Sequence, residues 1–257
     1  MAIQENPHLP PEPRVAAVSA DGAFVEGGRV VHAGNGVRWI ASGWRLFRRQ
    51  PLIWVLLTIV FGLITVGLFV IPVIGPLAVV LVVPVLVGGM MTGCRNVERG
   101  EELELADLFA GFRRNTGSLI TVGLIGLGLF VAISIPVMFL TGAGAMFASM
   151  SYENPAALMS AAALLAVLLI TALTIPVNMA LWFAPALVLL RNQSATASLL
   201  QSFRACLKNL VPFLLYGFVL FVLALVASIP AGLGWLVLGP VVIGSIYAAY
   251  RDIFLAS

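Results

Sequence analysis

The sequence predicts an all-α membrane protein, a polytopic bundle of six transmembrane helices. Of the 257 residues, 61% are apolar and only 10% are charged, and the mean hydropathy is +1.07. Soluble domains carry about 45–50% apolar and about 25% charged residues, so a water-soluble fold would lack the polar surface that it needs. The few charged residues are also spaced so that long uncharged stretches lie between them, and these stretches define the individual helices.

The uncharged stretches are residues 50–94, 115–152, 154–190 and 209–250. One crossing needs about 20 residues at about 1.5 Å each, so the first and last stretches hold two crossings each and the middle two hold one each. The predicted crossings are Leu52–Ile71, Leu77–Gly93, Leu119–Leu140, Ala163–Leu190, Val211–Ile229 and Leu233–Ala249. Glycines within them are expected to let the helices pack closely, for example Gly62, Gly89 and Gly217.

The fourth crossing is long and contains Pro176 and Pro185. Because proline removes a backbone hydrogen bond and clashes with the preceding turn, we expect a bent helix. Two short helices are the alternative. They would give seven crossings and would place Arg191 on the opposite side from the other arginines.

Lysine and arginine predict the orientation, because these residues are concentrated in cytoplasmic loops. With six crossings all 14 lie on one side, and the loop around Glu153 on the other side carries none. The sequence therefore predicts a multi-pass protein of the bacterial cytoplasmic (inner) membrane with both termini in the cytoplasm.

One pattern occurs three times along the chain. A basic residue is followed directly by an amide, and an Ile-Pro pair comes 21 or 22 residues after that amide. The three pairs are Arg49-Gln50, Arg114-Asn115 and Lys208-Asn209. The pattern predicts three parallel hairpin repeats, at about residues 37–95, 104–191 and 195–252, and parallel repeats do not argue for alternating access.

A short amphipathic segment precedes each predicted hairpin. Ile40, Trp44 and Phe47 form the apolar face of the first, and residues 105–112 and 199–206 repeat the pattern. Such helices lie in the headgroup layer, with the apolar face in lipid and the cations toward lipid phosphate. The residues expected to contact headgroups are Arg45, Arg48, Arg49, Arg113, Arg114, Arg204 and Lys208.

Residues 1–36 are expected to form a flexible cytoplasmic tail, and residues 37–257 the transmembrane domain. Four prolines among the first 13 residues favour an extended chain. Within residues 23–32, Gly27 and Gly28 separate two short apolar runs, which is the pattern of a small β-hairpin.

The predicted crossings contain no Lys, Arg, His, Asp or Glu, although such residues are the usual marker of ion and proton pathways. Asn178, Thr174 and Trp182 are candidates for an intramembrane polar pocket, or for hydrogen bonds to a neighbouring helix. Cys94 and Cys206 are too few for a disulfide framework and are expected to pack in the interior.

Candidate catalytic and metal groups are few. The only histidines lie in the expected tail, so neither a Ser-His-Asp set nor a histidine-rich metal site is expected in the membrane. The acidic stretch of residues 98–107 is either a solvated face that offsets nearby arginines or an oxygen-ligand cation site. We expect no catalytic residue, no metal and no cofactor.

Three segments carry a resemblance to a known family: GNGVRWIASGWRLFRRQPLIW (Gly34–Trp54), LFAGF (Leu108–Phe112) and SIYAAYRDIF (Ser245–Phe254). Over about Ala33 to Leu255 the sequence resembles an uncharacterised family of proteobacterial six-helix inner-membrane proteins, labelled with a Burkholderia locus tag. The resemblance implies an inner-membrane location and this topology. It implies no activity, substrate or catalytic residue.

The sequence thus predicts a non-catalytic membrane protein that binds membrane lipids, expected to be anionic, or a membrane-protein partner. Nucleic acid is not an expected partner, because the net charge of +3 reflects scarce acidic residues. The alternative is a carrier or channel for a small apolar or amphipathic molecule, favoured by the proline-broken fourth crossing. A third hypothesis is an enzyme that acts on lipid through the acidic stretch.

Overall fold

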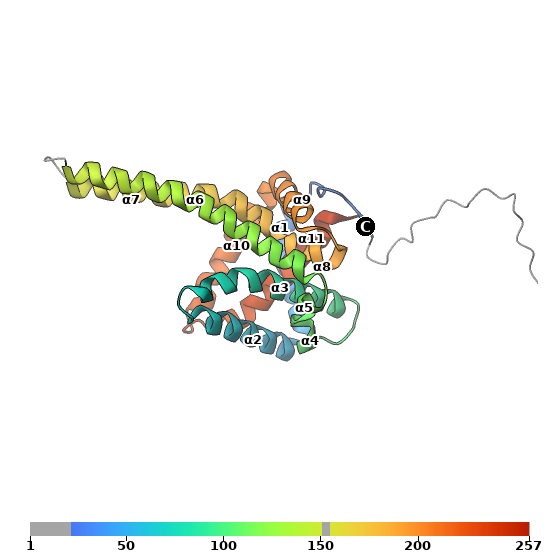
Figure 1. Ribbon diagram of the computed structural model, residues 1–257. Coiled ribbons are helices and arrows are strands. Elements are labelled where there is room, and N and C mark those ends of the chain that lie inside the picture. Colours follow the sequence, from blue (N-terminus) through green and yellow to red (C-terminus); the bar gives the residue numbers. More distant parts are fainter. Residues whose placement is uncertain (1–21, 151–154, 257) are drawn as a thin grey trace, which may run out of the picture.

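The computed structural model describes residues 22–150 and 155–256. This part of the chain is helical apart from one pair of two-residue strands (Figure 1). The elements in chain order are β1 (Ala23–Phe24), α1 (Asn35–Arg49), α2 (Pro51–Phe69), α3 (Ile74–Glu98), α4 (Leu105–Leu108), α5 (Ala110–Arg113), α6 (Thr116–Met150), α7 (Pro155–Trp182), α8 (Ala184–Arg191), α9 (Ala195–Lys208), α10 (Leu210–Ser228), α11 (Trp235–Phe254) and β2 (Leu255–Ala256).

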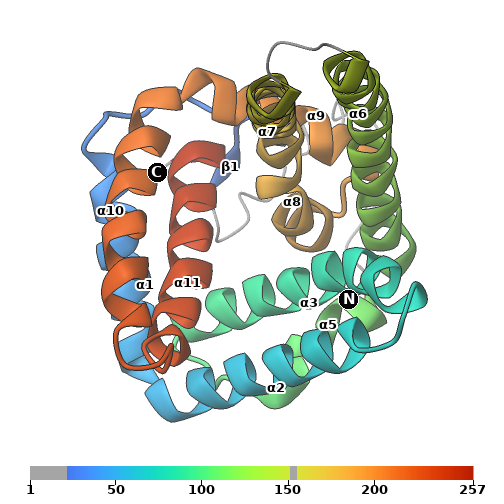
Figure 2. The same ribbon diagram turned by 90° about the vertical axis from the view of Figure 1, so that its left-hand side faces the viewer.

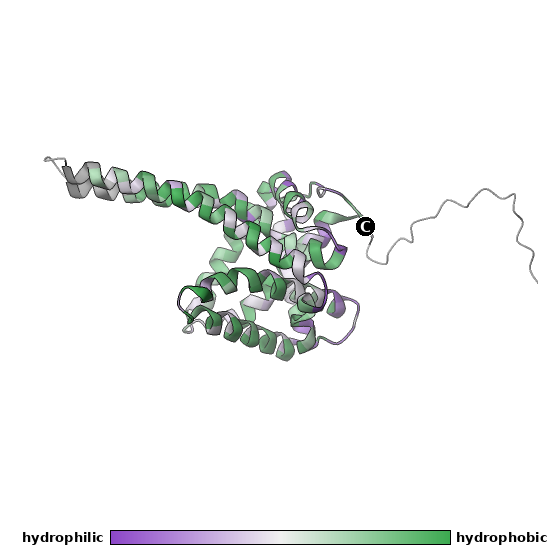
Figure 3. Cartoon of the chain, in the orientation of Figure 1, coloured by the Kyte–Doolittle hydropathy of each residue, from purple (hydrophilic) through white to green (hydrophobic). Residues whose placement is uncertain are grey.

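Six helical segments are long and apolar enough to cross a membrane, namely α2, α3, α6, α7 with α8, α10 and α11. The prediction of six membrane-capable helices is therefore confirmed. Their outer surfaces are apolar and uncovered: Leu52 on α2 is 87% exposed and Leu214 on α10 is 72% exposed. The ribbons of these helices are coloured mostly as hydrophobic residues, whereas hydrophilic residues gather toward the side on which the C-terminus lies (Figure 3). An apolar surface of this extent is suited to hydrocarbon rather than water.

The fourth crossing is broken rather than bent. Helix α7 runs through Pro176 without interruption and ends at Trp182, and α8 begins two residues later, just before Pro185. Pro185 lacks an N–H group, which ends the hydrogen-bond ladder at this point. The Phe183 N–H between the two helices donates instead to the Ser202 Oγ at 2.9 Å. Helix α8 has only eight residues, too few to cross a bilayer, so the break adds no seventh crossing.

The helices form a frame of tilted pairs. Helices α6 and α7 lie side by side and extend beyond the rest of the molecule (Figure 1). From the side of their tips, α10 and α11 run up one side of the molecule while α2 and α3 run across its lower edge (Figure 2). Helix α3 contacts α2, α6, α8 and α11. It is therefore the central helix of the body.

Helices α1 and α11 approach most closely at a pair of glycines. A Cβ atom at Gly244 would lie 2.9 Å from the Gly43 Cα, and a Cβ atom at Gly43 would collide with the Val241 carbonyl. Gly89 on α3 is equally crowded by the backbone of α4, as expected. A Cβ atom at Gly62 or at Gly217 would have no neighbour within 4 Å among the described residues. The expectation that these two glycines bring helices together is therefore wrong.

The amphipathic helices bury part of their apolar faces in protein, while Trp44, Leu105, Phe112 and Leu200 remain exposed. On α1, Ile40 and Phe47 are buried against the bundle, where α1 packs on α10 and α11, and only Trp44 of the expected face remains exposed at 44%. On α9, Cys206 is buried in the same way. The expected placement of these faces in lipid is therefore wrong for the buried residues. On α1 the reason is the glycine contact with α11, which brings α1 into the bundle.

Residues 22–34, which we call the strap, pack on the bundle and do not belong to a flexible tail. Strand β1 pairs antiparallel with β2 rather than closing the expected hairpin, with Ala23 opposite Ala256. The Val25 N–H donates to the Phe254 carbonyl at 2.8 Å. The last carbonyls of a helix have no partners within the helix, so the strap supplies donors to the end of α11. Residues 1–21 of the expected tail lie outside the described residues.

Candidate functional site

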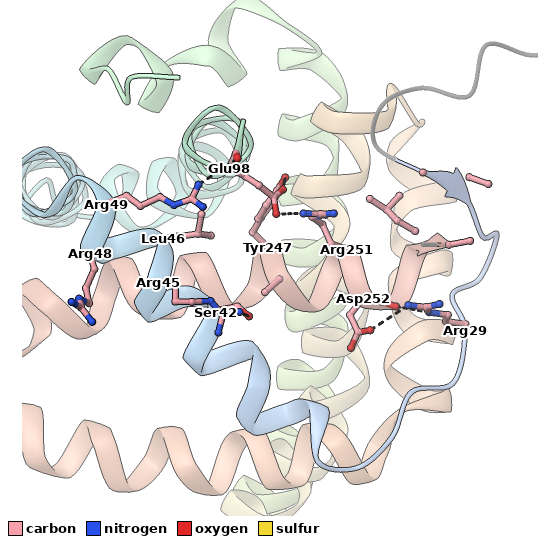
Figure 4. Close-up of a pocket in the computed structure, with 15 residues that line it drawn as sticks. Arg29, Ser42, Arg45, Leu46, Arg48, Arg49, Glu98, Tyr247, Arg251 and Asp252 are labelled. Carbon is pink, nitrogen blue, oxygen red and sulfur yellow. Dashed lines mark hydrogen bonds and ion pairs between the residues drawn. The ribbon is translucent and has the colours of Figure 1, made fainter. Parts of the chain in front are cut away.

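A pocket of about 1120 Å³ opens where α1, the end of α3 and the end of α11 meet the strap (Figure 4). Five arginines and two carboxylates line it, so the side chains of the wall carry an excess of positive charge. These residues, which define the arginine pocket, are Arg29, Arg45, Arg48, Arg49, Arg251, Glu98 and Asp252.

Helix α1 supplies three of these arginines from its polar face. The opposite face carries buried Trp39 and Leu46 and is fixed against the bundle, so the arginines point out of the core. Arg49 donates to the Val97 carbonyl at 2.7 Å and to the Glu98 carbonyl at 3.3 Å. These carbonyls belong to the last turn of α3, and the Val97 carbonyl also accepts a hydrogen bond from the Gly100 N–H at 3.2 Å. Arg49 thus joins α1 to the end of α3.

Glu98 joins α3 to α11. Its carboxylate pairs with Arg251 and accepts a hydrogen bond from the Tyr247 hydroxyl at 2.8 Å. The two charged side chains are partly exposed, at 35% and 43%, and exposed ion pairs contribute only about 0–1 kcal/mol. The pair neutralises Arg251 more than it stabilises the fold.

Asp252 holds the strap and α1 against α11. Its Oδ2 accepts hydrogen bonds from the Asn35 Nδ2 at 2.8 Å and the Trp39 Nε1 at 2.9 Å. The Arg29 guanidinium pairs with Oδ1 at 3.4 Å and donates from Nε to the Asp252 carbonyl at 2.6 Å. Sequence reasoning missed Arg29, Glu98, Asp252 and Tyr247 as site residues. The available signal was Arg251, a cation two residues after the last predicted crossing.

Two arginines of the pocket keep their charge unneutralised. Arg45 donates to the Ser42 Oγ at 2.8 Å, and within the described residues Arg48 has no hydrogen bond or ion pair. Arg29 and Arg251 are paired with carboxylates, and Arg49 donates hydrogen bonds to backbone carbonyls. Guanidinium groups present planar pairs of donors that match phosphate and carboxylate oxygens. Arg45 and Arg48 therefore give the pocket the capacity to bind an anion.

The other cations expected at lipid headgroups lie outside this pocket. Arg113 and Arg114 are exposed at the end of α5, and Arg204 is exposed on α9. The Lys208 Nζ donates to the carbonyls of Gly27 and Gly28, both at 3.1 Å, so it holds the strap. The structure thus brings together three of the seven expected residues, all from α1.

A second cavity, of about 380 Å³, lies among α3, α6, α7, α8 and α11, and we call it the membrane cavity. Asn178 and Trp182 line it, and the other lining side chains are apolar. Thr174 does not line the cavity, and its Oγ1 donates to the Thr171 carbonyl at 3.0 Å within the same helix. Two of the three expected polar residues therefore meet, in a cavity that is mostly apolar.

The acidic stretch has structural contacts. Asp107 accepts hydrogen bonds from the Asn96 Nδ2 at 3.0 Å and from the Glu104 N–H at 3.1 Å, which fixes the turn before α4. Glu98 is used by Arg251 and Tyr247. In the described ranges, no three His, Cys, Asp or Glu side chains form a group suited to a metal ion.

Comparison with known proteins places these residues in a wider set. A family described as "Domain of unknown function (DUF7847)" matches residues 37–251. A "Probable inner membrane protein" of Burkholderia thailandensis is 33% identical over 207 residues, which cover 77% of this chain and 76% of the relative. No solved structure matches the chain. The resemblance to an uncharacterised Burkholderia inner-membrane protein family is confirmed, and the matched region includes α1 but not the strap.

Proposed function

This chain belongs to the DUF7847 family, and we propose that it is a non-catalytic, multi-pass protein of the inner membrane that binds anionic lipid through its arginine pocket. The relative's printed name supports the inner membrane as the location. Six membrane-capable helices support the multi-pass arrangement. The ligand and the absence of catalysis are parts of the proposal.

The arginine pocket is the observation that carries this proposal. It lies at the ends of α3 and α11, two of the six membrane-capable helices, where lipid headgroups would stand beside the protein. A basic residue near an anionic membrane surface contributes about 1 kcal/mol of attraction, and among the described residues no carboxylate pairs with Arg45 or Arg48. A headgroup with a net negative charge fits this pocket better than a zwitterionic headgroup, whose cation would meet the same arginines.

The pairing of the chain ends supports the proposed orientation. Strand β1 begins at Ala23 and β2 ends at Ala256, and the two strands are hydrogen-bonded neighbours. A chain whose described ends meet must cross the membrane an even number of times. The tips of α6 and α7 lie at the other end of the molecule (Figure 1). Because the cations lie with the chain ends, the positive-inside rule favours a cytoplasmic location for both termini.

Three amides support the proposed repeats. The Gln50 side chain donates to the Glu101 carbonyl and accepts from the Leu103 N–H, Asn115 donates to the Val188 carbonyl, and Asn209 bonds the strap. Each amide stands between a short helix and the spanning helix that follows. The three equivalent positions thus perform the same task, which is to fix another segment to the start of a spanning helix.

Native mass spectrometry tests the lipid proposal. The protein is released from nanodiscs that contain phosphatidylcholine and phosphatidylglycerol, and retained lipids are counted. We expect preferential retention of phosphatidylglycerol that falls several-fold in Arg45→Ala/Arg48→Ala but little in Arg113→Ala/Arg114→Ala, which removes the same charge elsewhere. Equal losses in both double variants would mean general surface attraction, and no preference in the wild type would refute the proposal. A co-purifying membrane-protein partner without retained anionic lipid would replace lipid by partner binding.

The membrane cavity favours one second candidate, a carrier or channel for a small apolar or amphipathic molecule. Its volume of about 380 Å³ is within the range of about 300–1,000 Å³ for small-molecule sites. Flux of such a molecule into proteoliposomes, blocked when the cavity is filled by Val122→Phe, would support it. Flux no faster than in protein-free vesicles would remove it.

A further inference from the structure

The membrane cavity is separate from the arginine pocket, with which it shares no lining residue. Its wall comes from helices that are neighbours in the fold (Figure 2). Val79 and Val83 on α3 and Val122 and Phe130 on α6 face Leu181 on α7. These side chains form an apolar chamber within membrane-capable helices. The proposed headgroup site is therefore not required for anything that binds here.

One polar side chain of the wall has an unused hydrogen-bonding atom. The Asn178 Nδ2 donates to the Thr174 carbonyl at 2.9 Å, whereas Asn178 Oδ1 accepts no hydrogen bond from the described residues. The Trp182 Nε1 also has no partner among them, but this atom is fully buried, so a ligand in the cavity does not reach it. The wall therefore offers one free acceptor, the Asn178 Oδ1.

Two prolines lie in the same wall. Pro84 and Pro185 both line the cavity and have no N–H group, so neither adds a backbone donor. The Val80 carbonyl, four residues before Pro84, faces α6, where a Cβ atom at Gly123 would lie 2.6 Å from it. Unpaired polar groups are costly in hydrocarbon, where water does not replace the missing partner. A ligand that donates a hydrogen bond to Asn178 Oδ1 would supply the partner that the protein does not.

We infer that the membrane cavity binds a neutral, lipid-soluble molecule with a hydroxyl group, such as a long-chain alcohol. A hydroxyl group donates a hydrogen bond, and Asn178 Oδ1 lies in the wall as a free acceptor. The apolar body of the molecule lies against the valines. The described residues that line the cavity include no Lys, Arg, His, Asp or Glu, so an ionised headgroup would have no counterion at a depth where charge is expensive.

Three matched probes test this inference on the full chain in phosphatidylcholine nanodiscs. They are a brominated long-chain alcohol, its methyl ether and the corresponding alkane, and the readout is saturable quenching of tryptophan fluorescence, checked by native mass spectrometry. Neither the ether nor the alkane donates a hydrogen bond. We expect the alcohol to bind about fivefold to tenfold more tightly than either of them. Equal affinities for the three would overturn the inference and leave a chamber for any acyl chain.

Variants assign the hydrogen bond. Asn178→Leu is expected to lower the affinity for the alcohol about fivefold, measured by native mass spectrometry, and to leave the alkane unchanged. Thr174→Val, one turn away and outside the cavity, is the matched control and should change neither. Undiminished alcohol binding in Asn178→Leu would refute the assignment. If this variant fails to fold, the comparison of the three probes on the wild type still decides the inference.

Discussion

Replacement of Asn209 by alanine is expected to release the strap while the six crossings remain folded. Asn209 is 1% exposed. Its Nδ2 donates to the carbonyls of Arg29 and Ala205, both at 2.9 Å, and its Oδ1 accepts from the Val31 N–H at 2.8 Å. Each hydrogen bond contributes about 0.5–1.5 kcal/mol net. Two of these bonds join Asn209 to the strap, and the third stays with α9. Their loss therefore costs about 2 kcal/mol, and this raises the equilibrium constant for strap opening roughly 30-fold.

Hydrogen exchange measures this opening directly. In detergent, the amides of Val25 and Val31 should exchange about 30-fold faster in Asn209→Ala, while the amides of α3 and α11 keep their rates. Thr196→Ala, an exposed change in the first turn of α9, is the control and should leave all rates unchanged. An acceleration of less than about threefold at Val31 would refute the reasoning. It would mean that β1, the Lys208 contacts and the Arg29–Asp252 pair hold the strap without Asn209.

Three further outcomes follow from the packing, the titration of Cys206 and the topology. Gly43→Ala places a Cβ against the Val241 carbonyl and should lower the free energy of unfolding by about 1–3 kcal/mol, whereas Gly217→Ala, with nothing within 4 Å, should keep or raise the melting temperature in detergent. Burial raises the pKa of the Cys206 thiol to about 12, so maleimide at pH 8 should label this thiol only after unfolding. Because the pKa in the folded protein exceeds the pKa in the unfolded chain, the stability that depends on the neutral thiol is complete below about pH 9. It is lost as the pH rises toward 12. A reporter fused to the C-terminus should be active in the cytoplasm, and activity in the periplasm would refute the proposed orientation.

The crossings could be predicted because bilayer thickness sets the length of an uncharged helix. The predicted start at Leu52 differs by one residue from the observed start of α2 at Pro51. The third crossing, predicted to end at Leu140, continues as helix α6 to Met150, because no proline or charge interrupts the chain there. Hydropathy predicts which residues cross the hydrocarbon core of the membrane, but it does not predict where a helix ends outside that core.

The candidate site was only partly predictable, because its halves lie far apart in the sequence. Arg45, Arg48 and Arg49 share one helix, so a local pattern was enough to group them. Arg29 and Asp252 are separated by 223 positions, and no periodicity links a residue of the strap to the end of α11. The expectation of a flexible tail was wrong for residues 22–34 for the same reason. The strap donates hydrogen bonds to carbonyls at the end of α11, and the sequence alone does not show where that helix ends.

The strap also connects α9 to the proposed lipid site. Arg29 lies within the strap and lines the arginine pocket, and Asn209 and Lys208 hold that segment. A ligand that binds only the closed pocket must stabilise the closed strap by the same free energy with which the strap favours the ligand. The Asn209→Ala variant should therefore retain less phosphatidylglycerol than the wild type although it removes no charge. The Asn209 amide thus positions a cationic residue that lies 180 positions earlier in the chain.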